Sequence, residues 1–446
     1  MICKYPNCAD MQIVKNPDKK DWNILLQRPY VDNRSVLESV QQILNAVKQH
    51  GDEAVRSFTK KFDGVELENF QVSEKQITDA GDQLSSQLKN AIGQAQLNIE
   101  TFHRSQLSET EIIETMPGVQ CWRKNIGIEK VGLYVPGGTA PLFSTVLMLA
   151  IPAKLAGCKE IILCTPCNKD GEVHPAILFA AQLVGIDKIY KVGGAQAVAA
   201  MAYGTETVDA VYKIFGPGNQ YVTVAKQLVQ MQGVAIDMPA GPSEVCVIAD
   251  ETADPAFIAA DLLSQAEHGA DSQVLLVSNH EDVIRKVQDE LSKQIELLPR
   301  KEIAEKALNN SKAIILNTID EAIELVNEYA SEHLIISCHN ADAIAERITN
   351  AGSVFIGNYS PESVGDYASG TNHTLPTNGF ARAYSGVSID SFVKKVTYQK
   401  LSIKGLNQIA DTVIAMARAE GLDAHANAVT VRIKPNGDQN VSTPMA

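Results

Sequence analysis

Residues 130–138, Lys-Val-Gly-Leu-Tyr-Val-Pro-Gly-Gly, decide the fold of this chain. The run 130–135 is mainly apolar, which predicts a buried β-strand, and Pro136-Gly137-Gly138 predicts a tight turn into a helix that ends near residue 155. The alternation continues with strands at 160–164, 188–192 and 210–215 and helices at 174–184, 194–200 and 219–230. Such alternation predicts a parallel sheet covered by helices on both faces.

A second module repeats this pattern. Its predicted strands are 244–249, 273–278, 313–317, 334–337 and 353–357, and its predicted helices are 254–268, 281–295, 319–330 and 340–350. The predicted fold class is therefore α/β, with two doubly wound, incomplete Rossmann-like parallel-sheet domains. An N-terminal helical arm and a C-terminal tail complete the prediction.

Amphipathic helices precede both modules. Apolar residues at helical spacing predict one helix that ends near Gly51, a second at 53–61, and a long helical stretch at 73–107 that Gly81 and Gly93 bend or split. We expect these helices to pack on the second module. The predicted domains are an arm at 1–30, a discontinuous α/β domain at 31–130 and 240–385 that carries the metal and catalytic residues, an α/β cofactor-binding domain at 131–239 and a tail at 386–446.

Composition narrows the class of protein. The chain has 446 residues and a formal net charge of −14, and no dense Lys/Arg block stands out, which argues against nucleic acid or an anionic membrane as a partner. No apolar run is long enough to span a bilayer, and the N-terminus has no apolar core of a signal peptide. The expected location is the cytoplasm, where the eight cysteines would be free thiols.

Three glycine turns follow predicted strands, at 136–138, 193–194 and 216–218. Such turns allow close backbone approach at the carboxyl ends of strands, and the following helix N-terminus favours anions, so they indicate a phosphate-bearing cofactor. Ordinary turn glycines remain the alternative. No G-x-G-x-x-G motif occurs. Residues 132–139 nearly match a P-loop, but Gly138 replaces its lysine, which argues against an NTPase.

Polar residues gather on the predicted helix at 254–268. Asp261, Gln265 and His268 stand at i, i+4 and i+7, so they share a face that could ligate a metal. The alternative is a solvated helix face. Glu332 and His333 stand at the entry to a buried strand, where a carboxylate beside an imidazole suits acid/base chemistry, and the alternative is a polar cap.

Two later segments carry further polar residues. A predicted long loop at 357–378 contains Glu362, Asp366 and His373, and long ordered loops are often functional. Asp366 either ligates a metal or caps a turn. His425 follows the predicted tail helix at 406–419 and either has a role in the site or begins a further helix.

Taken together, these stretches resemble the histidinol dehydrogenase family. The motifs that carry the resemblance are Val131-Gly-Leu-Tyr-Val-Pro-Gly-Gly138, Gly193-Gly-Ala-Gln196, Phe215-Gly-Pro-Gly-Asn219, Ala240-Gly-Pro-Ser-Glu244, Asp261–Gly269, Ser331-Glu-His-Leu334, Gly365-Asp366, Gly370-Thr-Asn-His-Thr-Leu-Pro376 and Glu420-Gly-Leu-Asp-Ala-His425. They are long, ordered and spread over about residues 30–433, so the resemblance is specific.

The resemblance implies an NAD-dependent homodimer with one Zn²⁺ per subunit that oxidises L-histidinol through L-histidinal to L-histidine, the last two steps of histidine biosynthesis. It implies that the tail exchanges between subunits, so that His425 and Glu420 complete the partner's site. By resemblance, the metal ligands are Gln265, His268, Asp366 and His425, the catalytic pair is Glu332 and His333, the substrate contacts are Ser243, Gln265, His268, His333, Asp366, His373, Glu420 and His425, and the NAD contacts are Tyr134, Gln196 and Asn219.

The residue chemistry agrees with this implication. A mixed nitrogen and oxygen ligand set without thiolate suits zinc, and also cobalt or manganese. His333 can take the alcohol proton and Glu332 can activate water for the aldehyde step, so no cysteine is needed, and Cys246 lies in an apolar strand. Two rival hypotheses are a zinc hydrolase of a small amide, which leaves the glycine turns unexplained, and a non-catalytic α/β ligand-binding protein.

Overall fold

The structure is a computed structural model that describes residues 11–28, 34–137, 141–239 and 241–433. The chain divides into two compact units, one of residues 1–106 and 128–392 and one of residues 107–127 and 393–446. Gly138 of the predicted first turn, Thr139 of the near P-loop match, Ala240 of a family motif, and the two chain ends at 1–10 and 434–446 lie outside the described residues.

The first unit contains a parallel sheet of five strands in the order β6-β5-β4-β7-β8. From β4 the chain first adds β5 and β6 on one side and then returns to add β7 and β8 on the other. β4 and β7 therefore flank the switch point, the place where open α/β sheets bind ligands. The strands are β4 (Lys130–Tyr134), β5 (Glu160–Thr165), β6 (Lys188–Lys191), β7 (Lys213–Phe215) and β8 (Ala235–Ile236). The first predicted module is confirmed, with β8 as an addition.

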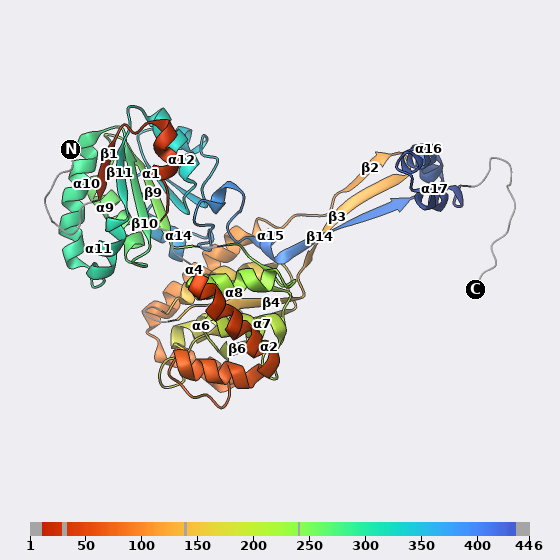
Figure 1. The fold of residues 1–446 in the computed structure, drawn as a ribbon, viewed down its shortest axis with the longest axis horizontal. Helices are drawn as coiled ribbons and strands as arrows, with labels where there is room; N and C mark the ends of the chain where they lie inside the picture. The colour runs from red at the N-terminus through yellow and green to blue at the C-terminus, as the bar shows by residue number, and fades with distance from the viewer. Residues whose placement is uncertain (1–10, 29–33, 138–140, 240, 434–446) are drawn as a thin grey trace. The chain divides into compact units, whose positions relative to one another are not determined.

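Helices cover both faces of this sheet (Figure 1). One face packs against α2 (Arg34–Phe62), α7 (Gly194–Tyr203) and α8 (Gln220–Gln230), and the other packs against α3 (Glu74–Asp79), α4 (Ser86–Arg104), α5 (Phe143–Leu155) and α6 (Pro175–Leu183). The prediction that the early helices pack on the second module is therefore wrong, because Val40 and Leu44 of α2 join the cluster of α7 and α8. An amphipathic stripe shows that a helix face is buried, and it does not show against which sheet.

The second sheet of this unit has six parallel strands in the order β1-β11-β10-β9-β12-β13. Its strands are β1 (Gln12–Lys15), β9 (Glu244–Ala249), β10 (Gln273–Ser278), β11 (Lys312–Ile315), β12 (His333–Ser337) and β13 (Ser353–Ile356). One face packs against α9 (Pro255–Ala266), α10 (Glu281–Gln294) and α11 (Lys301–Asn309), the other against α1 (Trp22–Leu25), α12 (Ile319–Tyr329) and α13 (Ala341–Ala345). The second predicted module is thus confirmed.

The predicted N-terminal arm is part of this second sheet. β1 pairs with β11 along its edge, and Trp22 and Leu26 are buried in the cluster on one face. The prediction of a separate arm is wrong for residues 11–28. The edge strand β1 has only four residues, and so short a segment does not indicate that it pairs with a strand about three hundred residues away.

Glycines break the early helices where the sequence predicts it. Gly51 takes φ 47° and ψ −129° and separates two helical segments within α2. A residue with a side chain rarely adopts this conformation, and an added Cβ would meet the Glu206 carboxylate at 2.3–2.9 Å. The stretch at 73–107 is divided near Gly81 into α3 and α4, whereas Gly93 lies inside α4 without ending it.

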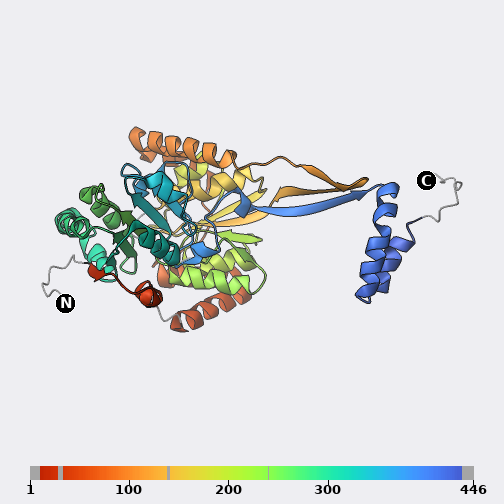
Figure 2. The ribbon, with the colours of Figure 1, turned by 90° about the horizontal axis from the view of Figure 1, so that it is seen from above.

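The second unit is a three-stranded antiparallel sheet with two helices at one end (Figures 1 and 2). Its elements are β2 (Ile112–Met116), β3 (Val119–Gly127), β14 (Val393–Leu401), α16 (Ile403–Ala419) and α17 (Asp423–Thr430). Trp122 of β3 stacks on Tyr398 of β14 at a ring distance of 5.5 Å. The sequence predicted the tail and its helix α16, but it did not predict β2 and β3, which join this unit from the middle of the chain.

The predicted boundary of the tail at residue 386 also moves. Residues 386–392 belong to the first unit, where Phe392 is fully buried and its ring lies 3.9 Å from that of Phe215. Val387 and Ile389 of the same segment are buried as well, but these apolar residues are too few and too scattered to indicate in the sequence which unit they join. Across the described residues, none of the helices combines the length and the apolar character that a membrane crossing needs.

Candidate active site

A cavity of about 1240 Å³ lies in the first unit between its two sheets. The glycine turn after β7 lines one side of it, and Ser243, His268, Glu332 and His373 line the other. The first sheet presents the carboxyl ends of its strands, whereas the second sheet presents the starts of β9 and β12. The cavity therefore brings parts of two predicted cofactor turns, Pro136 and the turn at 216–218, to the same place as Glu332 of the predicted acid/base pair.

The glycine turns depend on close backbone approach. Gly216 takes φ 125°, and a Cβ on it would lie 2.0 Å from the carbonyl oxygen of Tyr134, so only glycine fits there. The Tyr134 hydroxyl accepts a hydrogen bond from the Gly194 N–H at 3.0 Å, and burial raises the pKa of Tyr134 to about 12. Tyr134 thus links the turns that follow β4 and β6.

The turn after β7 leads into α8. Asn219 caps this helix, and its side-chain oxygen accepts from the N–H groups of Tyr221 and Val222 at 3.0 and 3.2 Å. Gln196 is buried on α7. A buried ion pair of Lys226 with Asp237 holds Gly216, because Lys226 Nζ donates to its carbonyl at 2.8 Å and Asp237 Oδ2 accepts from its N–H at 2.8 Å.

Glu332 and His333 are both buried at the start of β12. One residue of the neighbouring strand holds both side chains. The N–H of Glu244 donates to Glu332 Oε2 at 2.9 Å, and the carbonyl of Glu244 lies 3.1 Å from His333 Nδ1, which donates to it. His333 Nε2 faces Asp366 Oδ1 at 3.4 Å and has no hydrogen-bond partner among the described residues.

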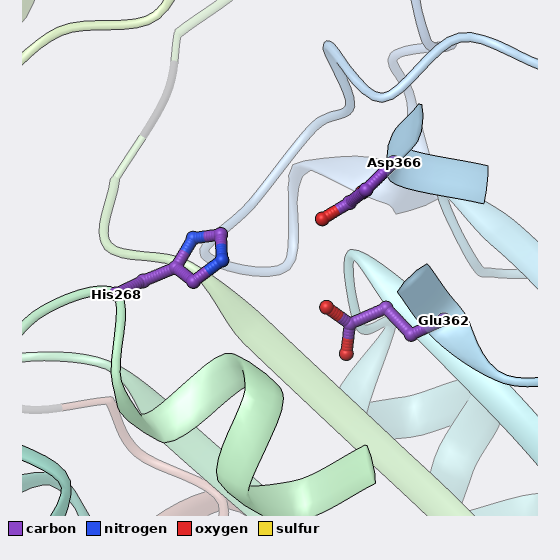
Figure 3. Close-up of side chains that lie close together, drawn as sticks. All are labelled: His268, Glu362 and Asp366. Carbon is purple, nitrogen blue, oxygen red and sulfur yellow. The ribbon is translucent and has the colours of Figure 1, made fainter. Parts of the chain in front are cut away.

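A possible metal-binding group lies beside this pair (Figure 3). His268 follows α9, and Glu362 and Asp366 stand one turn apart on the short helix α14 (Glu362–Tyr367). One ligand atom from each side chain lies within 4.8 Å of the others. In Figure 3 the imidazole of His268 points toward the two carboxylates, an arrangement that suits a cation with nitrogen and oxygen ligands.

Gln265 lies next to this group and is fully buried. With its amide nitrogen turned toward Glu362, it donates to both carboxylate oxygens at 2.6 and 3.1 Å, and its oxygen accepts from the Glu244 N–H at 3.3 Å. Glu362 therefore fixes the orientation of the Gln265 amide, since a carboxylate accepts only from the nitrogen end.

Three buried carboxyl groups and one imidazole dominate the electrostatics. Burial raises the pKa of Glu332 to about 8, and burial also raises the pKa of Glu362 to about 8. Burial disfavours the His333 cation, but the carboxylates of Glu332 and Asp366 outweigh this effect and raise the pKa of His333 to about 10. Burial opposes the Asp366 carboxylate, yet its contact with His333 lowers the pKa of Asp366.

The other predicted site residues divide between the units. Ser243 is half-buried just before β9, and His373 Nδ1 donates to the Asp366 carbonyl at 2.8 Å while its Nε2 lies 3.2 Å from the Thr145 hydroxyl. Glu420 and His425 belong to the second unit, at the end of α16 and in α17, and both are exposed there.

Glu362 was not predicted as a ligand or as a support of the site. The sequence prediction treated residues 357–378 as one long loop, whereas the structure has the helix α14 within it. The signal was present, because Glu362 and Asp366 stand at i and i+4 and therefore share a helix face. The surrounding Gly, Ser, Asn and Pro residues concealed this short helix.

Comparison with known proteins identifies the family. The family model described as histidinol dehydrogenase matches residues 26–433. The chain belongs to the histidinol dehydrogenase family. The histidinol dehydrogenase of Bacteroides thetaiotaomicron is 58% identical over 423 residues, which cover 95% of this chain and 99% of the relative. The crystal structure of histidinol dehydrogenase from Elizabethkingia anophelis has a TM-score of 0.93 and 54% identity, with 95% of this chain and 98% of that chain covered.

Membership of the histidinol dehydrogenase family raises the question whether the residues fit a zinc ion. Two observations favour the fit. The His268, Glu362 and Asp366 side chains offer nitrogen and oxygen ligand atoms at mutual distances that a single ion can bridge. Burial also raises the pKa of Glu332 and of Glu362 to about 8, and a cation bound there would favour their ionised forms.

Proposed function

We propose that this chain oxidises L-histidinol through L-histidinal to L-histidine in the cavity between its two sheets. The chain is an NAD-dependent oxidoreductase of histidine biosynthesis by its family. The observation that carries the assignment to this cavity is that the buried Glu332–His333 pair, the His268–Glu362–Asp366 group and the turn after β7 converge there. NAD supplies the hydride acceptor for both oxidations.

Gln265, His268 and Asp366 are the proposed zinc ligands of this chain, and His425 from a second copy is the fourth. Zinc, when bound, would hold the imidazole and amine of the substrate and so orient its alcohol. Glu362 supports this set, because its carboxylate accepts from the Gln265 amide and leaves the Gln265 oxygen as the possible ligand atom.

His333 takes the proton of the alcohol at Nε2. Its Nδ1 donates to the Glu244 carbonyl, so Nε2 is the nitrogen that can accept a proton. The neighbouring carboxylates raise the pKa of His333, and a cation bound beside them would offset this charge and leave Nε2 unprotonated. Nε2 is also buried without a hydrogen-bond partner in the described chain, and it points toward Asp366 of the proposed metal site. A substrate hydroxyl would supply the partner that this atom lacks.

Glu332 activates the water for the second oxidation. Its Oε2 accepts from the Glu244 N–H, and none of the hydrogen bonds described for the chain involves Oε1. Oε1 can therefore accept a proton from a water that adds to the aldehyde carbon of L-histidinal. The resulting hydrate loses hydride to a second NAD, and L-histidine is the product.

Ser243 and His373 are proposed substrate contacts, since both line the cavity beside the acid/base pair. Tyr134, Gln196 and Asn219 are proposed NAD contacts near the switch point of the first sheet. None of these contacts requires a protein thiol. No disulfide joins the six cysteines within the described residues, which supports the cytoplasm as the location.

The proposed assembly is a homodimer in which the second unit of one copy completes the site of the other. This unit leaves large apolar side chains exposed, namely Ile112, Ile113, Ile403, Met416 and Val431. Exposed apolar residues in one unit favour burial against another chain. Glu420 and His425 are exposed in the same unit, so they are available to a second copy.

The test compares the two oxidation steps in purified, metal-replete protein. We expect NADH formation from histidinol and a zinc content near one ion per chain. We expect Glu332→Gln to lower the rate with histidinal about 10²–10⁴-fold and the rate with histidinol far less, because only the second step needs water. The exposed Glu328→Gln on α12 is the matched control and should match the wild type at both steps. Equal losses on both steps would contradict the water-activating role.

A further inference from the structure

Glu244 is the first residue of β9, and its carboxylate is held on every side. Arg28 forms a bidentate pair with it, from Nε to Oε1 and from Nη2 to Oε2, both at 2.9 Å. The Asn378 N–H donates to Oε1 at 2.8 Å. The side chains are 13% and 1% exposed, so this ion pair is buried.

Arg28 is itself fixed by a second set of contacts. Its guanidinium lies 3.9 Å from the ring centroid of Tyr329, and Nη2 donates to the Tyr329 carbonyl at 2.7 Å. The Tyr329 hydroxyl in turn donates to Gln273 at 2.8 Å, at the start of β10. A planar guanidinium can stack and donate in two directions at once, which a lysine ammonium cannot do.

The backbone of Glu244 is the link to the acid/base pair. Its N–H donates to Glu332 Oε2 and its carbonyl accepts from His333 Nδ1, so the backbone of one residue fixes the position of both side chains. The bond from His333 Nδ1 also fixes the imidazole with Nε2 toward Asp366. A shift of the Glu244 side chain moves this backbone, because the carboxylate is tied at both oxygens.

We infer that Arg28 and Glu244 are a positioning pair that holds Glu332 and His333 in reactive geometry. Arg28 also lines the cavity, but its guanidinium is taken up by Glu244 and Tyr329, so the positioning role acts through the Glu244 backbone. Arg28 stands in the N-terminal segment just after α1, outside the motifs that carry the family resemblance, so the inference extends the active site to that segment. The inference rests on the proposed roles of Glu332 and His333.

The test removes the bidentate geometry of the Arg28 guanidinium and keeps its positive charge. Arg28→Lys should lower kcat with histidinol and with histidinal by about 10–100-fold, because small displacements of reacting groups have effects of this size. KM for NAD should stay within about twofold, since the hydrogen bonds described for the Arg28 guanidinium and the Glu244 carboxylate do not involve the turns of the first sheet. Arg28→Ala should regain activity when low-millimolar guanidinium is added, and an equal concentration of sodium chloride should not restore it.

Arg56→Lys is the matched control. Arg56 also stacks on a buried ring, that of Phe70, and its Nε donates to the Leu67 carbonyl at 3.0 Å, but it lies away from β9 and β12. This variant should keep wild-type kcat. Circular dichroism and active-site titration report the folded fraction of each variant, so that kcat refers to folded protein only.

Two results would overturn the inference. One is a kcat of Arg28→Lys equal to that of Arg56→Lys, and the other is a loss that disappears once the folded fraction is taken into account. Glu332→Gln and His333→Asn are measured in parallel. If both keep wild-type rates, the proposed function fails, and if both lose activity while Arg28→Lys does not, only the positioning role fails.

Discussion

The buried pair of Lys226 and Asp237 offers the most quantitative prediction. Their side chains are 5% and 1% exposed, and together they hold both polar groups of the Gly216 peptide. Lys226→Met removes the cation that contacts Asp237, whose carboxylate keeps hydrogen bonds from the N–H groups of Gly216 and Met238 among the described residues. Lys213 interacts with Asp237 electrostatically and does not replace the lost ion pair. Removal of one partner from a buried pair typically costs about 3–5 kcal/mol, so we expect a loss of that size in the free energy of unfolding.

The double variant Lys226→Met with Asp237→Asn separates the stability lost through the unpaired charge from the stability lost through the changed side-chain shape. A neutral amide oxygen still accepts from the Gly216 N–H, and no unpaired charge remains, so about 2 kcal/mol of the loss should return as coupling energy. Because the pair holds the turn that precedes Asn219, KM for NAD should rise about tenfold in the single variant, which corresponds to about 1.4 kcal/mol. The alcohol step at saturating NAD should change little.

The measurements are urea unfolding followed by circular dichroism and initial rates at varied NAD. Lys159→Met is the control, because Lys159 pairs with Glu129 at 3.2 Å beside the same sheet and both side chains are more than half exposed. Its cost should stay below about 1 kcal/mol. A single variant as stable as this control, or a double variant as unstable as the single, would refute the reasoning. A stability loss with an unchanged KM would refute the link to NAD.

Three further predictions concern the metal, the dimer and pH. Asp366→Asn should lower bound zinc well below one ion per chain by metal analysis, whereas unchanged metal content would remove Asp366 from the ligand set. Inactive His268→Ala and His425→Ala chains, refolded as a mixture, should regain part of the activity, and continued inactivity would argue for sites within one chain. Burial lowers the pKa of His103 below 6.5, so protonation favours the unfolded chain. Acidification from about pH 7.5 to about pH 5 should therefore destabilise the wild type more than His103→Gln in urea unfolding, and equal losses would contradict this.

The sequence by itself determined the two α/β modules. Their strands are short apolar runs bounded by glycine and proline, and this local pattern predicts a buried parallel strand wherever the run occurs. Gly51 likewise predicted a break in the helix, and the structure confirms it, because Gly51 has a positive φ and separates two helical segments of α2. The family motifs were also local, since each one is a continuous stretch of a few residues.

Only the tertiary structure decided what these elements pack against. Helix α2 has a clear apolar stripe, yet its partner turned out to be the β4–β8 sheet, because a stripe specifies burial and not the surface that provides it. β1 pairs with β11 about three hundred residues away, and β3 pairs with β14 from the other end of the chain, so nothing local predicts either pairing.

The candidate site shows the same division. The sequence named Glu332, His333 and Asp366 from motifs, but the hydrogen bonds from one peptide of β9 to the acid/base pair required two neighbouring strands in register. Glu362 and Arg28 were recognised as parts of the site only from the folded structure, in which Glu362 contacts Gln265 and Arg28 contacts Glu244. Burial, which sets the charge of such groups, is a property of the folded chain alone, because it depends on atoms that the sequence places far apart.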